Sequence, residues 1–431
     1  MDTIYVHGGV PLHGEVRVSG TKNGSLALLA SALLVPDETV IENLPDVADI
    51  GTMVEILRTL GAKCDFLGPR TLRINASELT SCEAPEELVR RMRASFYVAG
   101  PLLARCGMGC VPRPGGCVIG SRPIDYHLTG FRALGAEVVE EHGFVVARAA
   151  RLYGGQVFLD PRYRSVGATV NIMMAAVLAD GTTLIENASR DPDVVQCARF
   201  LNACGARITG IGGAAMRVTG VDRLHGARFA AAPDRMEAGT FLMAAAATRG
   251  DVSVRGARAT DLMQLLDALR QAGCDIEIGR NAVRLRLSGR PRPFDVVTAP
   301  FPGFPTDLHP PTVVLQALAS GRSIMEETIF EARFNYADEL SRMGARIHIK
   351  GNTAITTGIP KLSGAPVVAT DLRAGAALAL AGLAAEGETE INGAEHLDRG
   401  YENFVGKLRE LGADVVRRAE GGARLNYVYS R

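Results

Sequence analysis

The sequence lacks an excess of either charge and a hydrophobic run long enough to cross a membrane. Lys and Arg together number 47, as do Asp and Glu, so the formal net charge is zero. Proteins that bind nucleic acid over a broad surface need an excess of basic residues, so we expect no nucleic-acid partner. The apolar segment GAALALAGLAAEG is shorter than a bilayer span, and the N-terminus shows no signal-peptide pattern. We expect a cytoplasmic protein with no membrane partner.

Several common site motifs are also missing. The eight cysteines form no C-x-x-C pair, and CGMGC at 106–110 is one residue too wide for one half of a zinc site. The histidines form no H-x-x-x-H pair, and neither a phosphate-binding G-x-x-x-x-G-K-[ST] loop nor a G-x-S-x-G elbow occurs. The glycine-rich TGIGGAAMRVTG at 209–220 is typical of a hairpin rather than a dinucleotide loop. We therefore expect no metal and no cofactor.

A pattern of about seventy residues repeats along the 431-residue chain. Each copy is a helical stretch that ends at a glycine and is followed by a strand, as in LRTLGAKC, FRALGAEV and LRELGADV. The glycines are spaced by 68 to 74 residues and are Gly61, Gly135, Gly205, Gly273, Gly344 and Gly412. Glycine commonly ends a helix because it adopts the left-handed conformation without strain.

Each copy also contains an Ala/Leu-rich helix, such as SLALLASALL, that is apolar nearly all round. Such helices are expected in the interior, with the strands outside them. The segment 4–16 also resembles 216–228, so the chain is a duplicated three-copy domain. We predict an α/β fold of two inside-out domains, each with three similar units. Their predicted limits are 22–231, which carries a lid loop around Cys117, and 1–21 plus 232–431, with the active site in the cleft between them.

A charged residue precedes or begins each expected buried helix. These residues are Lys22, Arg93, Arg164, Asp234 with Arg235, Asp307 and Arg373. The first turn of a helix carries unpaired N–H groups and partial positive charge, which favour bound anions. Capping or surface charge explains any single copy, but six aligned copies favour an anion-binding site.

The motifs SGTKNGSLALLASALL, PRPGGCVIGSRPIDYH, FPTD, RFNYADELSRMGA and DRGYE resemble the UDP-N-acetylglucosamine 1-carboxyvinyltransferase family of enolpyruvyl transferases. The resemblance extends from about residue 4 to the C-terminus. It implies transfer of enolpyruvate from phosphoenolpyruvate to the 3-hydroxyl of UDP-N-acetylglucosamine with release of phosphate, by addition and elimination. This is the first committed step of peptidoglycan synthesis. The partners would be these two small molecules, and the protein would be a monomer or a weak oligomer.

The resemblance also assigns site residues. Those with catalytic roles are Cys117 as proton donor and site of a covalent adduct, Asp307 as general base, Lys22 and Arg399. Those that bind phosphoenolpyruvate are Lys22, Asn23, Arg122, Arg373 and Arg399. Those that bind the nucleotide sugar are Arg93, Arg122, Pro123, Ile124, Asp125, Tyr126, Arg164, Ser165, Val166, Gly167, Asp307 and Ile329.

Two lysines common in the family are absent. Tyr163 stands before the Ser-Val-Gly stretch, where Arg162 or Arg164 is a candidate substitute, and Ala48 replaces the second lysine. These departures keep open an enolpyruvyl transferase that acts on another nucleotide acceptor in secondary metabolism. A shikimate-phosphate acceptor fits less well because of GTKNGSLAL and the loop cysteine. A catalytically inactive nucleotide-sugar sensor is a further alternative. It is disfavoured because such a protein would need neither an acid nor a base.

The sequence alone generates a prediction about Cys117. Replacement of this residue by Ser should abolish the covalent adduct with phosphoenolpyruvate, because the serine hydroxyl is a far weaker nucleophile than a thiolate. Intact-protein mass spectrometry of wild type and variant after incubation with phosphoenolpyruvate measures this. An adduct that persists in Cys117→Ser would identify a different thiol.

Overall fold

The computed structural model describes residues 2–114, 119–120 and 123–418. They form two compact units. Among the described residues, unit 1 comprises 2–19, 119–120 and 233–418, and unit 2 comprises 20–114 and 123–232. Ile119 groups with unit 1, where its carbonyl accepts a hydrogen bond from the Ala332 N–H at 3.1 Å. No helix among the described residues is both long and apolar enough to span a bilayer.

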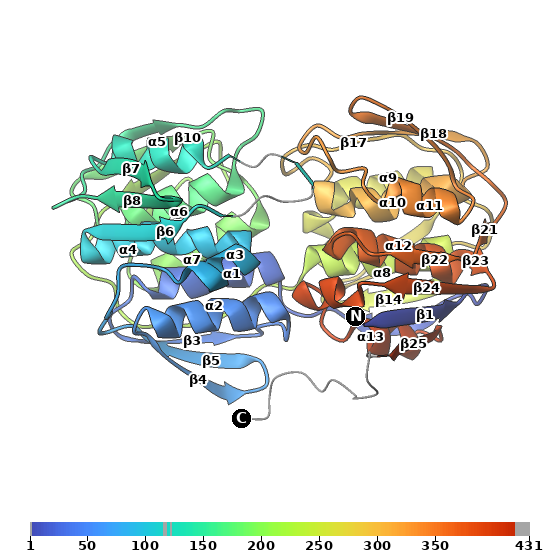
Figure 1. Ribbon diagram of the computed structural model, residues 1–431, viewed down its shortest axis with the longest axis horizontal. Helices are drawn as coiled ribbons and strands as arrows, with labels where there is room; N and C mark the ends of the chain where they lie inside the picture. Colours follow the sequence, from blue (N-terminus) through green and yellow to red (C-terminus); the bar gives the residue numbers. More distant parts are fainter. Residues whose placement is uncertain (1, 115–118, 121–122, 419–431) are drawn as a thin grey trace. The chain divides into compact units, whose positions relative to one another are not determined.

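The strands of unit 2 form the sheets β13-β3-β5-β4, β11-β12-β10-β9 and β6-β8-β7 (Figure 1). Their bounds are β3 (Glu38–Glu42), β4 (Lys63–Gly68), β5 (Thr71–Asn75), β6 (Met108–Pro112), β7 (Glu137–Glu141), β8 (Phe144–Arg148), β9 (Gln156–Phe158), β10 (Thr182–Glu186), β11 (Arg207–Thr209), β12 (Ala215–Thr219) and β13 (Arg228–Ala230). The antiparallel pairing of β11 with β12 confirms the predicted hairpin.

The strands of unit 1 form the sheets β22-β24-β1-β25, β15-β16-β14-β2 and β17-β18-β20-β19, with a short pair β21-β23. Their bounds are β1 (Thr3–His7), β2 (His13–Arg17), β14 (Asp251–Arg255), β15 (Asp275–Ile278), β16 (Ala282–Arg286), β17 (Val296–Val297), β18 (Arg322–Glu326), β19 (Arg346–Lys350), β20 (Thr353–Thr357), β21 (Leu362–Ser363), β22 (Pro366–Val368), β23 (Ala385–Glu386), β24 (Glu388–Asn392) and β25 (Asp414–Arg418).

The sheets repeat one pairing pattern. In one sheet β3 pairs with β5 antiparallel and with β13 parallel, and in another β14 pairs with β16 antiparallel and with β2 parallel. The N-terminal strands complete unit 1, because β1 lies between β24 and β25 and β2 is the parallel edge strand beside β14. In the β6 sheet a single parallel bridge between Glu83 and Cys110 replaces the fourth strand.

The helices divide into buried and amphipathic ones. In unit 2 they are α1 (Lys22–Ala32), α2 (Ala48–Thr59), α3 (Glu86–Arg91), η1 (Arg93–Val98), α4 (Ala99–Cys106), α5 (Asp125–Ala133), α6 (Val166–Ala176) and α7 (Pro192–Ala203). In unit 1 they are α8 (Arg235–Ala247), η2 (Ala259–Asp261), α9 (Met263–Gln271), η3 (Thr306–Leu308), α10 (His309–Leu318), α11 (Ala337–Arg342), α12 (Leu372–Ala384), η4 (Ala394–Arg399) and α13 (Phe404–Glu410).

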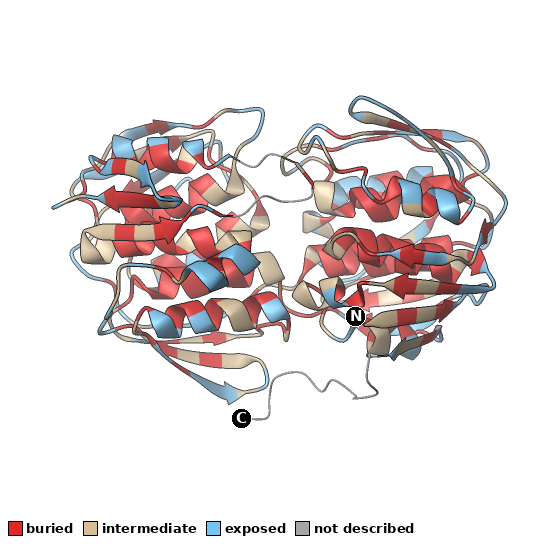
Figure 2. Cartoon of the chain, in the orientation of Figure 1, coloured by how far each residue is buried: buried red, intermediate tan, exposed pale blue. Residues whose placement is uncertain are grey.

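The buried helices form the core of each unit. All of α10, and α1 from Gly24 to Ala32, are buried, as are α6 from Ala168, α8 from Met236 and α12 from Arg373 to Leu383 (Figure 2). Burial of each Leu or Met side chain contributes about 1.5–3 kcal/mol, so helices with no polar face are stable only inside such a shell of sheets. The inside-out α/β fold predicted from the Ala/Leu-rich segments is confirmed within each unit.

The predicted helix-ending glycines all have positive φ. The values are 107° at Gly61, 90° at Gly135, 97° at Gly205, 96° at Gly273, 90° at Gly344 and 91° at Gly412. A side chain there would strain the left-handed backbone, which explains why each repeat ends its outer helix with glycine.

Two glycines of unit 2 provide a matched test of this explanation. Gly135→Ala should lower the free energy of unfolding by about 1–2 kcal/mol, because alanine is strained at a φ of 90°. Gly51→Ala should raise it by about 0.5–1 kcal/mol, because Gly51 lies inside α2 with nothing within 4 Å of an added Cβ. Urea unfolding followed by circular dichroism measures both. Equal shifts of the same sign would contradict the explanation.

Candidate active site

The charged residues predicted at the helix starts lie where the buried helices begin. Lys22 is the first residue of α1, Arg93 is the first residue of η1 before α4, and Arg373 is the second residue of α12. Asp307 lies in η3, directly before α10, and Arg164 precedes the N-cap of α6. Each unit therefore gathers polar groups at the starts of its apolar helices.

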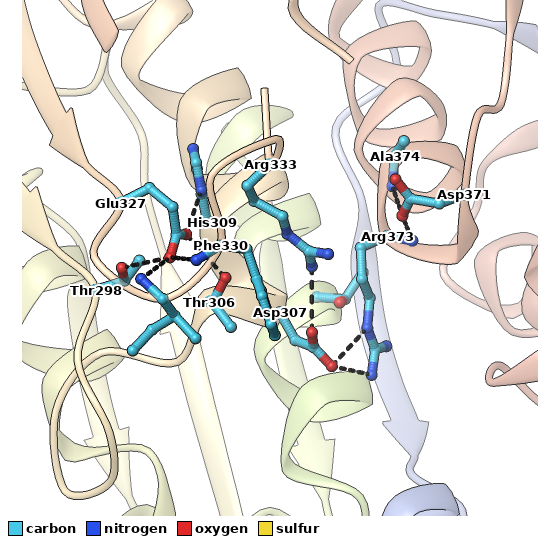
Figure 3. Close-up of polar contacts among 12 residues, drawn as sticks. Thr298, Thr306, Asp307, His309, Glu327, Phe330, Arg333, Asp371, Arg373 and Ala374 are labelled. Atoms are coloured by element: carbon cyan, nitrogen blue, oxygen red, sulfur yellow. Dashed lines mark hydrogen bonds and ion pairs between the residues drawn. The ribbon is translucent and has the colours of Figure 1, made fainter. Parts of the chain in front are cut away.

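In unit 1, the carboxylate of Asp307 lies between two arginines (Figure 3). Its Oδ1 accepts a hydrogen bond from Arg333 at 3.2 Å, and its Oδ2 accepts two from Arg373, at 3.1 Å from Nε and 2.9 Å from Nη2. The side chains of Arg333 and Arg373 are only 3% and 5% exposed, whereas that of Asp307 is 27% exposed. One partly open carboxylate is therefore shared by two buried cations, so the three side chains together keep a net positive charge.

The charge of Arg373 is retained despite its burial. Burial alone would lower the pKa of Arg373, but Tyr401, Asp307 and Asp234 together raise it. The guanidinium also lies over the ring of Tyr401, 5.2 Å from its centroid. An incoming phosphate or carboxylate that displaces Asp307 from Arg373 would find a fixed guanidinium fork, which suits both anions.

Two further predicted residues lie in the same unit. The Ile329 N–H donates to Glu327 Oε1 at 2.7 Å, and Glu327 lies in the segment just after β18. Arg399 is the last residue of η4, which packs against α12. Arg333 was given no role from the sequence, and the structure places it directly against Asp307.

In unit 2, Lys22 is held by a buried acid. Its Nζ lies 2.9 Å from Asp49 Oδ2, and the side chains are 13% and 4% exposed. Thr21 caps the helix by accepting from the Gly24 N–H at 3.4 Å, and it donates to Asp193 Oδ1 at 3.0 Å. Asn23 is the second residue of α1. The first turn of α1 thus carries the Lys22 ammonium group, which Asp49 holds in a fixed orientation.

The segment 123–126 contacts another predicted residue. Arg93 Nη2 donates to the Pro123 carbonyl at 3.4 Å, and Ile124 is the buried residue that precedes α5. Asp125 and Tyr126 are the first two residues of α5. The structure therefore brings together Arg93 and the 123–126 segment, which the sequence placed at one binding site.

The start of α6 is supported by a buried histidine. Ser165 caps the helix by accepting from the Ala168 N–H at 3.2 Å, and Val166 and Gly167 follow it. A Cβ on Gly167 would lie 3.1 Å from His127 Nε2, so this nitrogen faces the first turn. The helix start thereby combines backbone N–H groups with a ring nitrogen, an arrangement that can bind an anion.

Asn171 determines which nitrogen of His127 carries the proton. Its Oδ1 accepts from the Gly100 N–H at 2.8 Å, so its Nδ2 donates to the Phe96 carbonyl at 2.9 Å and to His127 Nδ1 at 3.0 Å. His127 Nδ1 is then an acceptor and Nε2 carries the proton. Burial, assisted by the nearby charge of Arg93, lowers the pKa of His127 to about 3. His127 is thus neutral, and its Nε2–H group is directed toward Gly167.

Comparisons with known proteins identify the family of this chain. A family model described as EPSP synthase (3-phosphoshikimate 1-carboxyvinyltransferase) matches residues 6–408. UDP-N-acetylglucosamine 1-carboxyvinyltransferase 3 of Caldanaerobacter subterraneus is 48% identical over 97% of this chain and 99% of the relative. UDP-N-acetylglucosamine 1-carboxyvinyltransferase 2 of Carboxydothermus hydrogenoformans is 49% identical over 97% and 99%. The chain belongs to the enolpyruvyl transferase family.

Solved structures of this enolpyruvyl transferase family share the fold. The enolpyruvyl transferase NikO from Streptomyces tendae has a TM-score of 0.87 at 27% identity, over 96% of this chain and 98% of that one. An EPSP synthase from Acinetobacter baumannii has a TM-score of 0.77 at 19% identity, over 97% and 100%. The second likeness concerns the fold alone.

The region of the missing family lysine is exposed. Tyr163 is 48% exposed, and Arg162 forms a hydrogen-bonded ion pair with Asp160 at 2.6 Å. Arg164 adopts a positive φ of 38° directly before the α6 cap. Arg162 is thus already paired with Asp160, whereas Arg164 adjoins Ser165 at the start of α6.

Two predicted residues, Cys117 and Arg122, lie outside the described residues, so their roles stay predictions. Within the part of the chain that the structure does describe, no group of three or more His, Cys, Asp or Glu residues could hold a metal ion.

The low pKa of His127 predicts a pH-dependent stability. Its folded pKa of about 3 lies below the unfolded value of about 6.5, so the unfolded state binds the proton first. As pH falls from 7.5 to 5, the free energy of unfolding should therefore drop by about 2 kcal/mol from this residue. Urea unfolding at both pH values should show a drop smaller by this amount in His127→Asn, whose amide can still accept from Asn171.

The exposed His348 in β19 is the matched control. His348→Asn should retain the wild-type pH dependence. If His127→Asn also retains it, His127 is protonated in the folded state and cannot be the neutral donor described above.

Proposed function

We propose that the protein transfers the enolpyruvyl group of phosphoenolpyruvate to the 3-hydroxyl of UDP-N-acetylglucosamine and releases inorganic phosphate. The observation that carries the proposal is the carboxylate of Asp307 held between Arg333 and Arg373. This arrangement supplies both a base and fixed cations, which an enolpyruvyl transfer to an alcohol needs. The near-complete coverage of two carboxyvinyltransferases at 48% and 49% identity supports the choice of acceptor.

In unit 1, Asp307 is proposed to exchange one of its partners when phosphoenolpyruvate binds. An anionic group of phosphoenolpyruvate replaces Asp307 at Arg373, whose charge is retained. Asp307, still held by Arg333, is then released from Arg373 and can accept the proton of the attacking 3-hydroxyl, as a general base must within hydrogen-bond reach. The Nε–H of Arg333 has no partner among the described residues, so this buried donor can also serve a bound anion. Ile329 and Arg399 are proposed to contact the nucleotide sugar and phosphoenolpyruvate, respectively.

In unit 2, the proposal assigns anion binding to helix starts. Lys22 and Asn23 at α1 would contact phosphoenolpyruvate, with Lys22 oriented by Asp49. Residues 164–167 at α6 would bind the diphosphate through N–H groups. Arg93 and residues 123–126 would contact the rest of the nucleotide sugar, consistent with the Arg93–Pro123 hydrogen bond.

The chemistry has two steps. In the addition, the 3-oxygen forms a bond to C2 of phosphoenolpyruvate, Asp307 accepts the hydroxyl proton, and Cys117 delivers a proton to the methylene carbon. In the elimination, the C–O bond to phosphate breaks, and phosphate leaves with the electron pair and takes up the proton held by Asp307. The new methyl group returns a proton to the Cys117 thiolate, which restores the double bond. Cys117 is proposed from the sequence motif around it, and it is also the proposed site of the covalent adduct.

The cellular role follows from this reaction. We propose that the protein acts in the cytoplasm on two small-molecule substrates, without a cofactor, at the entry to peptidoglycan synthesis. We propose a monomer or a weak oligomer.

The alternative function is enolpyruvyl transfer to a different acceptor. It is favoured at the position of the missing family lysine, where Tyr163 is exposed and Arg162 is paired with Asp160. These departures lie on the diphosphate side, so a different nucleotide acceptor is the specific competing proposal. The groups proposed to handle phosphoenolpyruvate would be common to both reactions.

Phosphate release decides between the two. The purified protein is incubated with phosphoenolpyruvate and, separately, UDP-N-acetylglucosamine, UMP or shikimate 3-phosphate. We expect rapid release only with UDP-N-acetylglucosamine. Asp307→Asn should lower that rate by about 10²–10⁴-fold, the usual contribution of a general base. Release with UMP alone would favour the alternative, and release with shikimate 3-phosphate alone would contradict both.

A further inference from the structure

A fully buried carboxylate, Glu327, accepts five hydrogen bonds beside the candidate site (Figure 3). Oε1 accepts from the Thr298 hydroxyl at 2.9 Å and from the N–H groups of Ile329 and Phe330 at 2.7 and 3.1 Å. Oε2 accepts from the Thr306 hydroxyl at 2.8 Å and from His309 Nδ1 at 2.8 Å. Glu327 was not singled out in the sequence.

These contacts stabilise the ionised form of Glu327. The two backbone N–H groups can only donate, and a carboxylate is the form that accepts from every side. Burial alone would raise the pKa of Glu327, but the hydrogen bonds from His309, Ile329 and Thr306 outweigh it and lower the pKa. Glu327 is thus a satisfied buried anion rather than a proton donor.

His309 continues the network away from Glu327. Because Nδ1 donates to Glu327, the neutral ring has Nε2 as an acceptor, and the Tyr336 hydroxyl lies 2.8 Å from it. Burial lowers the pKa of His309 despite the neighbouring carboxylate. The side chains of both His309 and Glu327 are 0% exposed. Both hydrogen bonds of His309 therefore run in the same direction: the Tyr336 hydroxyl donates to His309, and His309 donates to Glu327.

The network ties together the two loops that carry the paired charges. Thr306 and His309 flank Asp307 in the chain, and both bind Glu327 Oε2. Phe330 and Tyr336 bracket Arg333, and they bind Glu327 and His309, respectively. The Glu327–His309 pair thus holds the chain on both sides of Asp307 and on both sides of Arg333.

We infer that Glu327 and His309 are positioning residues that hold Asp307 in register with Arg333 for catalysis. The inference deepens the proposed function and rests on it, because it assumes that Asp307 is the base. Neither residue touches the reacting atoms in this role. A displacement of the base by 1 Å can cost about 100-fold in rate, so loss of this support should be visible in turnover.

Four variants test the inference. Glu327→Gln keeps the shape but turns an NH₂ group toward donors on one side. His309→Leu removes the Nδ1 donor, and His309→Asn retains a donor at the same distance along the side chain. Gln316→Leu is the matched control, because Gln316 lies buried in the same helix α10 and donates to the carbonyls of Phe294 and Ile324, away from Asp307.

We expect kcat per folded protein to fall about 10–100-fold in Glu327→Gln and His309→Leu and to recover within about threefold of wild type in His309→Asn. The KM for phosphoenolpyruvate should change little, because Arg373 is held separately at the start of α12, where Asp371 caps the Arg373 and Ala374 N–H groups. Gln316→Leu should retain kcat. Thermal unfolding supplies the folded fraction of each variant.

The outcomes separate this inference from the proposed function. A wild type that releases no phosphate with UDP-N-acetylglucosamine contradicts the proposed function, and the variants are then compared with the acceptor that wild type uses. Wild-type kcat in both Glu327→Gln and His309→Leu, or an equal loss in Gln316→Leu, overturns the inference. A crystal structure of Glu327→Gln gives a test independent of activity: Asp307 should leave Arg333, and an unchanged ion pair would overturn the inference.

Discussion

The candidate site of unit 1 depends on the pairing of one partly exposed carboxylate with two buried guanidinium groups. A buried cation without a partner costs several kcal/mol, so Arg333 and Arg373 need an anion at all times. Asp307 serves as that anion in the structure, through contacts of 2.9 to 3.2 Å. Under the proposed function, a substrate anion at Arg373 satisfies the same requirement, and Asp307 keeps its contact with Arg333 while it acts as the base. The stability of the unliganded site and its chemistry thus use the same contacts.

The inside-out fold explains why these charges are available at all. Helices with no polar face, such as α1 and α12, can bury their sides completely, and only their ends remain open to polar chemistry. The first turn of each carries unpaired N–H groups, so a side chain placed there adds to a potential that already favours anions. Similar repeats then differ in the charged residue near the helix start, which is Lys22 at the first position of α1 and Asp307 in η3, directly before α10.

Patterns within each repeat predicted the fold and the charged helix starts from the sequence. The side-chain pairs that join different elements could not be predicted in this way. The period of about seventy residues, the glycines at helix ends and the charged residues at helix starts all lie within one repeat, so a single sequence reveals them. Glu327 and His309 lie 18 residues apart on different elements, and only the packing of α10 against β18 joins them. The Lys22–Asp49 pair joins α1 to α2, and it could not be predicted from the sequence either.

The two buried histidines show how the same side chain takes opposite roles in the two units. His127 accepts at Nδ1 from Asn171, so its Nε2–H faces the start of α6 and can donate to a ligand. His309 donates at Nδ1 to Glu327 and accepts at Nε2 from Tyr336, so both nitrogens are used internally. Burial keeps both rings neutral, and the partner at Nδ1, an amide in one unit and a carboxylate in the other, selects the tautomer. The residue behind each histidine therefore decides whether it can bind a ligand or only support the site.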